Sequence, residues 1–526
     1  MYGSKEFNKL VIQTDQIHRL QSVVPETVVS RQFPNIAYVP WELDVCTKLE
    51  KLGFKRIVSP VFKSYAWSGN KTPYKKQAEI TGFCSLNPRG FVITGIGSGK
   101  TNGTLWAADY LMSIGTVRKC LIITTLSTVD VVWSDTLFCD YYHRRHAVLT
   151  GTAERRQRLF ADTNNDFYII NHDAFSIIRN QFLQRNDIDL IIIDESTAYK
   201  NAGTKRFQRL EKAIIMKQPK YVWALTATPT PNEPTDAWGQ AKLLGLHKGV
   251  SFSRFKDLTM RKVTNFRWEP LPEAHKYVAN ILTPSIRFAT SECVDLPPCI
   301  YSARKAYLTG AQMAMFKEMT KKLTVDFANG QANAVNEADK QNKLLQIACG
   351  FIYSRDANNE VVTQHVDPTA RLAVLDEILD TLPGKAIIFV PYTELIGILV
   401  KHLTPRGNCA TVYGEISRND RVDIFRDFQQ TNNIKYIIAH PKTMAHGVTL
   451  TAAATIIWYA PYASNEVYEQ ANGRINRPSQ VNTTNIVHIE STELEKRIFA
   501  KLARRQNTQG TLLDYLSELQ NARTTY

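Results

Sequence analysis

The sequence predicts an α/β protein with two parallel-sheet lobes, a small N-terminal module in front of them and a helical insertion between them. Short, nearly continuous apolar runs alternate with longer segments that can form helices, which is typical of strands buried on both faces of a parallel sheet. This alternation occurs twice, on either side of a basic and polar stretch near residues 249–365. With 526 residues the chain is also too long for one hydrophobic core.

Four segments follow from this pattern. We expect an accessory module at 1–65, a first lobe at 66–248, a linking segment with a helical insertion at 249–365, and a second lobe with a C-terminal helix at 366–526. The module mixes short apolar runs with one helix-like stretch, WELDVCTKLEKLGF. Its aromatic and lysine side chains could contact nucleic acid, and a packing role fits them equally well.

Composition and charge narrow the class of partner. The chain has 64 lysines and arginines against 49 aspartates and glutamates, a formal net charge of +15, which favours a polyanionic partner such as nucleic acid.

No apolar run reaches the roughly 18 residues needed to cross a bilayer. The start, MYGSKEFNKL, lacks the apolar core of a secretory signal. We therefore expect an intracellular, cytoplasmic protein (in the host-cell cytoplasm if the source is viral) with no membrane partner. The eight scattered cysteines form no Cys-x-x-Cys pair, which argues against a structural zinc site.

The first lobe opens with a glycine-rich turn between a strand and a helix, FVITGIGSGKT at residues 91–101. In a phosphate-binding loop, glycines let successive N–H groups point at a phosphate, and the N-terminus of the next helix adds partial positive charge. Lys100 would bind the β- and γ-phosphates, and the hydroxyl of Thr101 would hold Mg²⁺. The strict pattern has glycine where Thr94 stands, so an ordinary strand–helix turn is the alternative. The expected cradle consists of Gly97, Ser98 and Gly99.

Gln77 lies shortly before this loop, in the stretch KTPYKKQAEI. A side-chain amide both donates and accepts hydrogen bonds, so it can read the edge of an adenine. Most glutamines are surface residues, and Gln77 therefore supports nucleotide binding only together with the loop.

Four apolar runs after the loop predict further parallel strands, at 120–125, 167–171, 190–194 and 221–226. The third continues as LIIIDEST and places Asp194 and Glu195 at its carboxyl end, where ligands bind in open α/β sheets. One carboxylate would anchor Mg²⁺ and the other could take a proton from an attacking water. An acidic pair at a strand end is otherwise a simple turn.

The fourth run continues as YVWALTATPTPN. The hydroxyls of Thr226 and Thr228 could hydrogen-bond to the acidic pair and sense the γ-phosphate. A strand end terminated by proline is the alternative interpretation.

The second lobe repeats the strand–helix alternation, from AIIFV at 386–390 to ATIIWY at 454–459, without a phosphate loop. YEQANGRINRPSQ then places Arg474 and Arg477 three residues apart, near one another on a helical turn. Guanidinium groups fit phosphate oxygens. A lobe with two arginines and no phosphate loop indicates arginine fingers for ATP held by the first lobe. The alternative is that both arginines form salt bridges.

The order of phosphate loop, DExx and TATP resembles that of helicase-type ATPases. More specifically, the sequence resembles the Swi/Snf-type (chromatin-remodeller-like) branch of the superfamily-two helicases, in its compact prokaryotic or viral form. DESTAYKNAGTKRFQRLEKAI resembles the acidic box, and LTATPTPN followed by EPTDAWGQAKLL resembles the third motif and the helix after it. LTPSIRFATSECVDLPPCIYSARKAYLTGAQ resembles the interlobe segment. KAIIFVPYTEL, YGEISRNDRVDIFRDFQ and PKTMAHGVTLTAAATIIWYAP are similar to the second-lobe motifs, and the resemblance covers about residues 70–505.

The resemblance implies two RecA-like lobes with ATP in the cleft between them, and nucleic-acid-dependent ATP hydrolysis that moves the protein along double-stranded DNA. It implies that Gln470, at the family's Gln-x-x-x-Arg spacing, acts with the two arginines. It also implies ATP and Mg²⁺ as cofactors, and we expect a monomer. The residues expected to couple hydrolysis to nucleic acid are Thr125, Thr226, Thr228, Thr443 and Gly447.

Three departures from the family pattern bear on function. Thr197 stands where the acidic box usually ends in histidine, which we expect to weaken coupling between ATP and the third motif. His446 and Thr449 stand where the family favours glycine and asparagine, which leaves nucleic-acid contact there open. The sequence shows no chromatin-targeting module, so a nucleosome substrate is not implied.

Three rival functions stay open at this point. A strand-separating DNA or RNA helicase would need a separating pin, which the sequence does not identify. A non-motor, ATP-gated DNA clamp would keep the nucleotide site without movement. A small-molecule P-loop kinase fits the loop and the acidic pair, but neither the second lobe nor its arginines.

Overall fold

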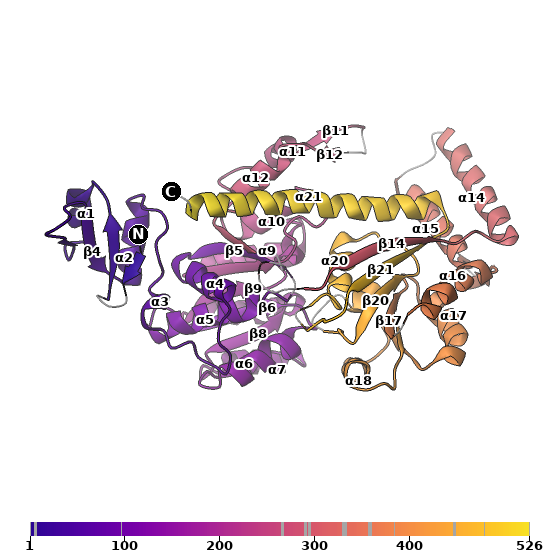
Figure 1. The fold of residues 1–526 in the computed structure, drawn as a ribbon, viewed down its shortest axis with the longest axis horizontal. Helices are drawn as coiled ribbons and strands as arrows, with labels where there is room; N and C mark the ends of the chain where they lie inside the picture. The colour runs from indigo at the N-terminus through magenta and orange to yellow at the C-terminus, as the bar shows by residue number, and fades with distance from the viewer. Residues whose placement is uncertain are drawn as a thin grey trace. The chain divides into compact units, whose positions relative to one another are not determined.

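The computed structural model divides into two compact units, which we describe separately (Figure 1). Unit 1 comprises Met1–Val294 and Thr508–Tyr526, and unit 2 comprises Asp295–Asn507. The structure describes residues 2–4, 8–95, 97–264, 268–288, 292, 296–328, 334–355, 360–382, 384–444, 449–477 and 479–524. No helix in these ranges is both long and apolar enough to cross a membrane.

The N-terminal module of unit 1 is a four-stranded antiparallel sheet with two helices and a core of its own. The strand order is β1-β2-β4-β3, and β4 alternates buried and partly exposed residues along IAYVP. Ala37 and Val39 of that strand pack with Trp41 and with Leu49 of α2 in one buried cluster. The sequence predicted the helix α2 but none of these strands, because each is short. The elements are β1 (Tyr2–Ser4), β2 (Lys9–Gln13), α1 (Ile17–Val23), β3 (Val28–Val29), β4 (Ile36–Pro40) and α2 (Leu43–Lys51).

The main part of unit 1 is a sheet of seven parallel strands in the order β13-β5-β10-β9-β6-β8-β7. This confirms the predicted parallel-sheet lobe. The runs at 167–171 and 221–226 are strands over their full predicted length. The strands are β5 (Arg89–Thr94), β6 (Lys119–Thr124), β7 (His146–Val148), β8 (Phe167–Asn171), β9 (Ile188–Ile193), β10 (Tyr221–Thr226) and β13 (Ser285–Phe288).

Helices cover both faces of this sheet, so its strands are apolar on both sides. Along β5, Phe91 and Ile93 face one buried cluster and Val92 faces the other. One face carries α4 (Lys75–Leu86), α5 (Lys100–Ser113), η1 (Val129–Ser134) and α6 (Asp135–Asp140). The other carries α7 (Ala153–Ala161), α8 (Phe175–Gln184), α9 (Lys205–Lys217), α10 (Asp236–Leu243), α11 (Phe252–Thr259) and α12 (Ala274–Ile281). The short elements are α3 (Val61–Ser64), η2 (His172–Ala174) and η3 (Ser196–Tyr199).

Unit 2 contains a second all-parallel sheet, of six strands in the order β14-β21-β20-β17-β19-β18. This sheet completes the two-lobed, RecA-like fold class predicted from the sequence. Its strands are β14 (Cys299–Lys305), β17 (Lys385–Phe389), β18 (Cys409–Val412), β19 (Tyr436–Ala439), β20 (Ala453–Trp458) and β21 (Thr484–Glu490). One face is covered by α16 (Thr369–Asp380) and α17 (Thr393–Leu403), and the other by α18 (Arg418–Gln430), α20 (Asn465–Asn472) and the start of α21 (Glu493–Thr524).

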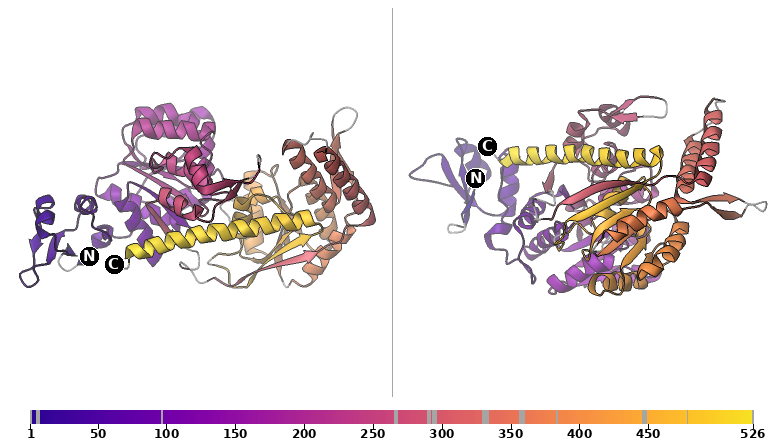
Figure 2. Two further views of the ribbon diagram at one scale, coloured as in Figure 1. Left: turned by 90° about the horizontal axis from the view of Figure 1, so that it is seen from above. Right: turned by 45° about the vertical axis from the view of Figure 1, so that its right-hand side comes forward.

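The stretch predicted as a linking segment contributes to both units. In unit 1 it forms α11, the hairpin β11 (Met260–Lys262) and β12 (Trp268–Pro270), α12 and the edge strand β13. In unit 2 it forms the edge strand β14, the hairpin β15 (Phe351–Arg355) and β16 (Val361–His365), and two long helices. The helices α14 (Gly310–Ala328) and α15 (Ala334–Cys349) lie side by side, as Figure 2 shows. The segment between them, residues 329–333, lies outside the described residues.

A buried ion pair fixes the start of α21 to α16 inside unit 2. Arg371 and Glu495 have side chains that are 1% and 0% exposed, and Arg371 Nη2 lies 2.6 Å from Glu495 Oε1. The same guanidinium donates to the carbonyls of Ala348 and Ile489. Glu495 Oε2 accepts the backbone N–H groups of Ser491 and Thr492. Because both ions are desolvated, each depends on the other to offset the cost of burial.

Replacing one partner of this pair should destabilise unit 2 strongly. We expect Arg371→Met to lower its free energy of unfolding by about 3–5 kcal/mol, because Glu495 would stay buried without a counter-charge. Hydrogen exchange of peptides from β17 and β20, measured during a urea titration, would give the free energy of unfolding of unit 2 separately. Asp423→Ala, which breaks the exposed pair of Asp423 with Arg426, is the control and should change stability by less than about 1 kcal/mol. Equal effects of the two substitutions would contradict the assignment.

Candidate functional site

The motifs predicted in the first lobe meet at one edge of the seven-stranded sheet. Strands β5, β10, β9 and β6 are consecutive neighbours and parallel, so their carboxyl ends lie together. The glycine-rich loop follows β5, Thr226 ends β10, Asp194 follows β9 and Thr124 ends β6. This is the edge at which open α/β sheets bind ligands.

The glycine-rich loop has the backbone that a phosphate cradle needs. Gly97 and Gly99 have φ values of +81° and +80°, a region that side chains disfavour. Ser98 closes the turn, since its N–H and its hydroxyl both donate to the carbonyl of Gly95, at 3.3 and 2.8 Å. Lys100 and Thr101 are the first two residues of α5. The unpaired N–H groups of this first helical turn and the helix dipole therefore favour an anion here.

Gln77 packs directly against this loop. It is buried in the first turn of α4, where its Oε1 accepts the backbone N–H of Tyr74 at 2.9 Å. A Cβ added to Gly99 would lie 2.0 Å from Gln77 Nε2, so only glycine fits at that position. The structure thus brings Gln77 and the predicted cradle together, with one oxygen lone pair of the amide engaged in holding α4.

Asp194 is buried and tightly held. Thr124 Oγ1 and Trp133 Nε1 both donate to its Oδ2 at 2.9 Å, and the N–H of Glu195 donates to its Oδ1 at 3.0 Å. Burial raises the pKa of Asp194, although Lys100 and the two side-chain donors favour the ionised form. The carboxylate is therefore fixed in direction, with acceptor capacity left on Oδ1.

Glu195 shows backbone strain and an unsatisfied oxygen. Its φ and ψ are 47° and 57°, the left-handed region that costs a non-glycine residue about 1–2 kcal/mol. Its Oε1 lies 3.6 Å from Lys100 Nζ. Its Oε2 is buried and has no hydrogen-bond partner among the described residues. A carboxylate oxygen left in this state is suited to accept a proton from a water molecule held at the site.

Sequence reasoning missed two residues that hold Asp194. One is Thr124, the last residue of β6, whose hydroxyl reaches Asp194. Its neighbour Thr125, predicted to couple hydrolysis to nucleic acid, is linked to Asp194 through two residues: it lies 2.9 Å from Thr128, which in turn contacts Thr124 at 2.6 Å. Trp133 lies on the π-helix η1, and a local widening of this kind has no sequence signature that we could have used.

The third motif does not contact the acidic pair as predicted. Thr226 Oγ1 instead accepts the N–H of Thr228 at 3.0 Å, because the chain turns back immediately after β10. The Thr228 hydroxyl is buried and has no partner in the part of the chain that the structure describes. No hydrogen bond joins either threonine to Asp194 or Glu195 within that part.

In unit 2, Arg474 and Arg477 lie in the turn that follows α20, and not on a helical turn as predicted, because α20 ends at Asn472. Arg474 Nε donates to the carbonyl of Gln470 at 3.0 Å. Arg477 donates to the Gly473 carbonyl at 3.1 Å and to Thr449 Oγ1 at 2.8 Å. Thr449, a departure from the family pattern, therefore orients one of the predicted arginines.

The electrostatics of this turn favour an anionic ligand. Burial lowers the pKa of Arg477 to about 10, and no carboxylate among the described residues pairs with it. The Oε1 of Gln470 is likewise buried without a described partner. A half-buried cation that the described residues hold by neutral acceptors is costly, and this pattern is common where a charged ligand binds.

The remaining second-lobe predictions are less informative. The hydroxyl of Thr443, in α19 (Pro441–Met444), lies 2.9 Å from the carbonyl of Val412 and 2.7 Å from that of His440. This hydroxyl therefore holds α19 to the neighbouring backbone. Gly447 and His446 lie outside the described residues.

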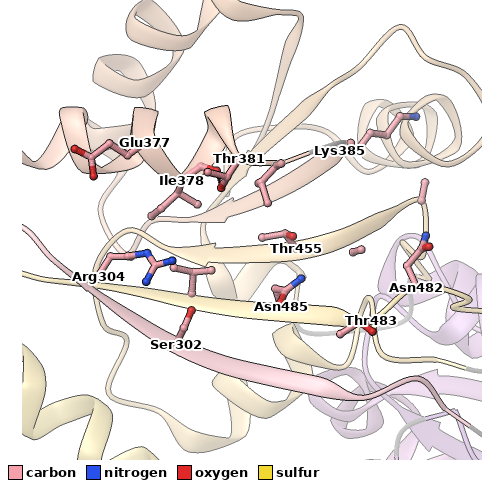
Figure 3. Close-up of a pocket in the computed structure, with 15 residues that line it drawn as sticks. Ser302, Arg304, Glu377, Ile378, Thr381, Lys385, Thr455, Asn482, Thr483 and Asn485 are labelled. Atoms are coloured by element: carbon pink, nitrogen blue, oxygen red, sulfur yellow. Dashed lines mark hydrogen bonds between the residues drawn. The ribbon is translucent and has the colours of Figure 1, made fainter.

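A cavity of about 790 Å³ in unit 2 is not part of this site (Figure 3). Ser302, Arg304, Thr455 and Asn485 line it together with the end of α16. It opens on the sheet face that α16 and α17 cover, whereas α20 packs on the opposite face. None of the predicted site residues lines it.

The residues of unit 1 fit ATP and a divalent metal. The glycine cradle and the N-terminus of α5 suit phosphates, and Lys100 lies at the start of that helix. Asp194 is fixed but keeps acceptor capacity for a metal or for its bound water. No group of three or more histidine, cysteine, aspartate or glutamate side chains among the described residues could hold a metal.

Comparison with known proteins identifies the family. A phosphate loop and an acidic pair at the edge of one parallel sheet, followed by a second lobe with two arginines in one turn, are typical of an ATPase of the helicase type. The SNF2-related domain matches residues 74–357 and the helicase conserved C-terminal domain matches residues 370–479. The chain belongs to the SNF2-related family and is a nucleic-acid-dependent ATPase of that kind.

Individual relatives are distant. Protein p41 of Acyrthosiphon pisum secondary endosymbiont phage 1 is 26% identical over 449 residues, 82% of this chain and 94% of the relative. An uncharacterized ATP-dependent helicase of Mycoplasma genitalium is 22% identical over 78% of this chain, which spans 39% of that relative. The solved Sulfolobus solfataricus SWI2/SNF2 ATPase core in complex with dsDNA is 22% identical, with a TM-score of 0.39 over 85% of this chain and 93% of the other. We draw no conclusion from a structural likeness at that score.

Gly99→Ala should abolish nucleotide binding. The new Cβ would lie 2.0 Å from Gln77 Nε2 and would also meet the strain of a positive φ. Titration with a fluorescent ATP analogue would measure the loss. Gly115→Ala is the matched control, because Gly115 has a φ of +71° but no atom within 4 Å of the position that a Cβ would take. It should cost about 1 kcal/mol of stability and leave ATP affinity unchanged. If Gly115→Ala lowered ATP affinity as much as Gly99→Ala does, the strain of a positive φ would explain the loss, and the contact with Gln77 would not.

The carboxyl group of Glu469 should make the stability of unit 2 depend on pH. Burial raises the pKa of Glu469 to about 7 from an ordinary value of 4.5. The folded state therefore binds this proton more tightly than the unfolded state, and the free energy of unfolding should fall as pH rises from about 4.5 to 7. Glu469→Gln should remove this slope and raise stability at pH 8 by about 1–3 kcal/mol. Urea titrations across the pH range would measure it, with exposed Glu415→Gln as the control. A slope that persists in Glu469→Gln would refute the assignment.

Proposed function

We propose that this protein hydrolyses ATP to move along double-stranded DNA. The observation that carries the proposal is the meeting of the phosphate loop with Asp194 and Glu195 at one sheet edge, in a chain whose second unit offers one buried and one half-buried arginine and no phosphate loop. The net charge of +15 supports a polyanionic track. Contacts to a phosphate backbone carry no base information, so binding should be independent of sequence and sensitive to salt.

In this proposal the residues of unit 1 bind and orient the substrate. Gly97, Ser98 and Gly99 cradle the phosphates, Lys100 binds the β- and γ-phosphates, and Gln77 contacts the adenine edge. Mg²⁺ held by Thr101 and Asp194 would neutralise phosphate charge.

Glu195 accepts a proton from the attacking water through the carboxylate whose Oε2 is unpartnered among the described residues. The water oxygen then bonds to the γ-phosphorus as the bond to the β–γ bridging oxygen breaks, and ADP and phosphate leave. Arg474 and Arg477, with Gln470, stabilise the charge that develops on the phosphoryl oxygens.

Strand separation is the second candidate function, and one observation favours it. The hairpin of β11 and β12, which the sequence did not reveal, is a two-stranded element with basic and aromatic side chains. Lys256 Nζ lies 3.7 Å from the ring centroid of Trp268, and Arg261 pairs with Glu269 at 3.0 Å. Val263, next to β11, is 47% exposed. An element of this kind could serve as a separating pin.

ATP hydrolysis measured with no nucleic acid, single-stranded DNA, double-stranded DNA and RNA tests the proposal. We expect the strongest stimulation with duplex DNA, and a loss on the order of a thousandfold in turnover for Arg477→Ala. Lys100→Ala should abolish hydrolysis. Arg406→Ala, which alters an arginine of unit 2 paired with Asp376 and Asp380, is the control and should leave turnover unchanged.

Triplex displacement and duplex unwinding distinguish the rival functions. Displacement of a third strand without unwinding would support translocation along duplex DNA. Unwinding, or stimulation by single strands or RNA alone, would favour a strand-separating helicase. Duplex stimulation without displacement or unwinding would indicate an ATP-gated clamp. Hydrolysis that ignores every nucleic acid would refute the motor.

A further inference from the structure

A buried glutamine, Gln240, connects the acidic motif (DEST, residues 194–197) to the third motif (TATPTPN, residues 226–232) of unit 1. Ser196, directly after Glu195, donates its hydroxyl to Gln240 Oε1 at 2.7 Å. The amide nitrogen of Gln240 donates to the carbonyl of Pro229 at 2.7 Å and to that of Asp236 at 3.0 Å. Ser196 is 1% exposed and Gln240 is fully buried. Both hydrogen-bonding ends of the amide are therefore used inside the protein.

The helix that carries Gln240 is pressed against the acidic motif. A Cβ on the neighbouring Gly239 would lie 2.4 Å from the carbonyl oxygen of Lys200 and 2.6 Å from that of Tyr199. Both carbonyls belong to the end of η3, the turn that begins at Ser196. At the other end of the link, Asp236 Oδ2 accepts the N–H groups of Asn232 and Glu233 and so fixes the segment after the third motif. α10 therefore holds both motifs at fixed positions.

We propose that Gln240 is a positioning residue that couples the acidic motif to the third motif through Ser196 and Pro229. This inference rests on the function proposed above and extends it to residues outside the predicted site. Movement of Glu195 as substrate binds and reacts is transmitted through Ser196 to the amide, and from the amide to the turn that contains Thr228 and Pro229.

Two features of the site give the link this role. The strained backbone of Glu195 must be held by its surroundings, and the hydrogen bond made by the next residue is one of the contacts that can hold it. The threonines of the third motif make no hydrogen bond to the acidic pair within the described chain. The route through Gln240 joins the two motifs by a side-chain hydrogen bond at each end.

The connection bears on one expectation. The departure at Thr197 predicted weak coupling between ATP and the third motif, because the family usually has histidine there. The 2.7 Å hydrogen bond between Ser196 and Gln240 gives the acidic motif a further link to α10, the helix after the third motif. In this proposal Ser196 and Gln240 contribute to the coupling.

A double-mutant cycle tests the inference on the full-length chain. Ser196→Ala, Gln240→Leu and the double variant should each lower kcat by about ten- to a hundredfold, because a small displacement of Glu195 is costly, while the Kd for a fluorescent ATP analogue stays unchanged. The double variant should be no slower than the slower single variant, since both remove one link. Ser85→Ala is the matched control, because Ser85 makes a buried 2.6 Å hydrogen bond with Ser59 away from both motifs.

Gln240→Glu adds a second test, the pH dependence of kcat, which would not change if Gln240 had only a structural role. A protonated carboxyl group keeps an acceptor for Ser196 and a donor for Pro229, whereas the ionised form loses the donor. We expect kcat of this variant to approach that of the unaltered chain at low pH and to fall as pH rises, with a thermal midpoint that stays above the assay temperature throughout.

The outcomes separate this inference from the proposed function. Unchanged kcat in Ser196→Ala and Gln240→Leu, or additive losses in the double variant, would overturn the link. A lowered thermal midpoint with unchanged kcat would show Gln240 to be structural only, and would also overturn it. If the unaltered chain hydrolyses ATP without any response to nucleic acid, the motor fails, while the basal kcat of the cycle still decides whether the link exists.

Discussion

The order of four parallel strands is the constraint on which the site of unit 1 depends. Because β10 lies between β5 and β9, the phosphate loop and the acidic pair are one strand apart, roughly 10 Å at the usual strand spacing. Side chains that extend from both sides can meet across that distance, and Lys100 Nζ does lie 3.6 Å from Glu195 Oε1. The register fixes the heights as well, with Thr226 beside Ile93 and Ala224 beside Ile193. A different strand order would separate the groups whatever their sequence.

Two glycines then let helices approach this edge closely enough to hold it. Gly99 has no side chain to displace Gln77, so α4 packs against the phosphate loop, and Gly239 has none to meet the carbonyl of Lys200, so α10 packs against the acidic motif. Each glycine is accompanied by a glutamine: the Gln77 amide reaches Gly99, and Gln240 directly follows Gly239. Close backbone approach and amide hydrogen bonding thus occur together, and they give the edge a rigidity that loops alone would not supply.

The sequence predicted the strands in which almost every residue is buried. YVWALT and FYIIN are buried on both faces, so an apolar run was a sufficient signal for β10 and β8. The edge strand β13 was missed because only alternate residues of SIRF are buried. The site was predictable where backbone chemistry demands particular residue types, as in Gly99 and Lys100. It was not predictable at Trp133 and Gln240, because their roles depend on which distant segment they meet. The role of Thr124 depends on where β6 ends, and strand ends are the least certain feature of any sequence pattern.

Energetically unfavourable features of the fold, such as backbone strain and unpaired polar groups, occur in the motifs of the candidate site. Glu195 combines a strained backbone with an unsatisfied oxygen, and the half-buried charge of Arg477 is contacted, among the described residues, by a carbonyl and the Thr449 hydroxyl. Elsewhere in unit 2 a buried guanidinium, that of Arg371, is neutralised by Glu495. Neutral acceptors orient the Arg477 guanidinium without cancelling its charge. The proposed role of Arg477 toward a phosphate anion requires such an uncancelled charge.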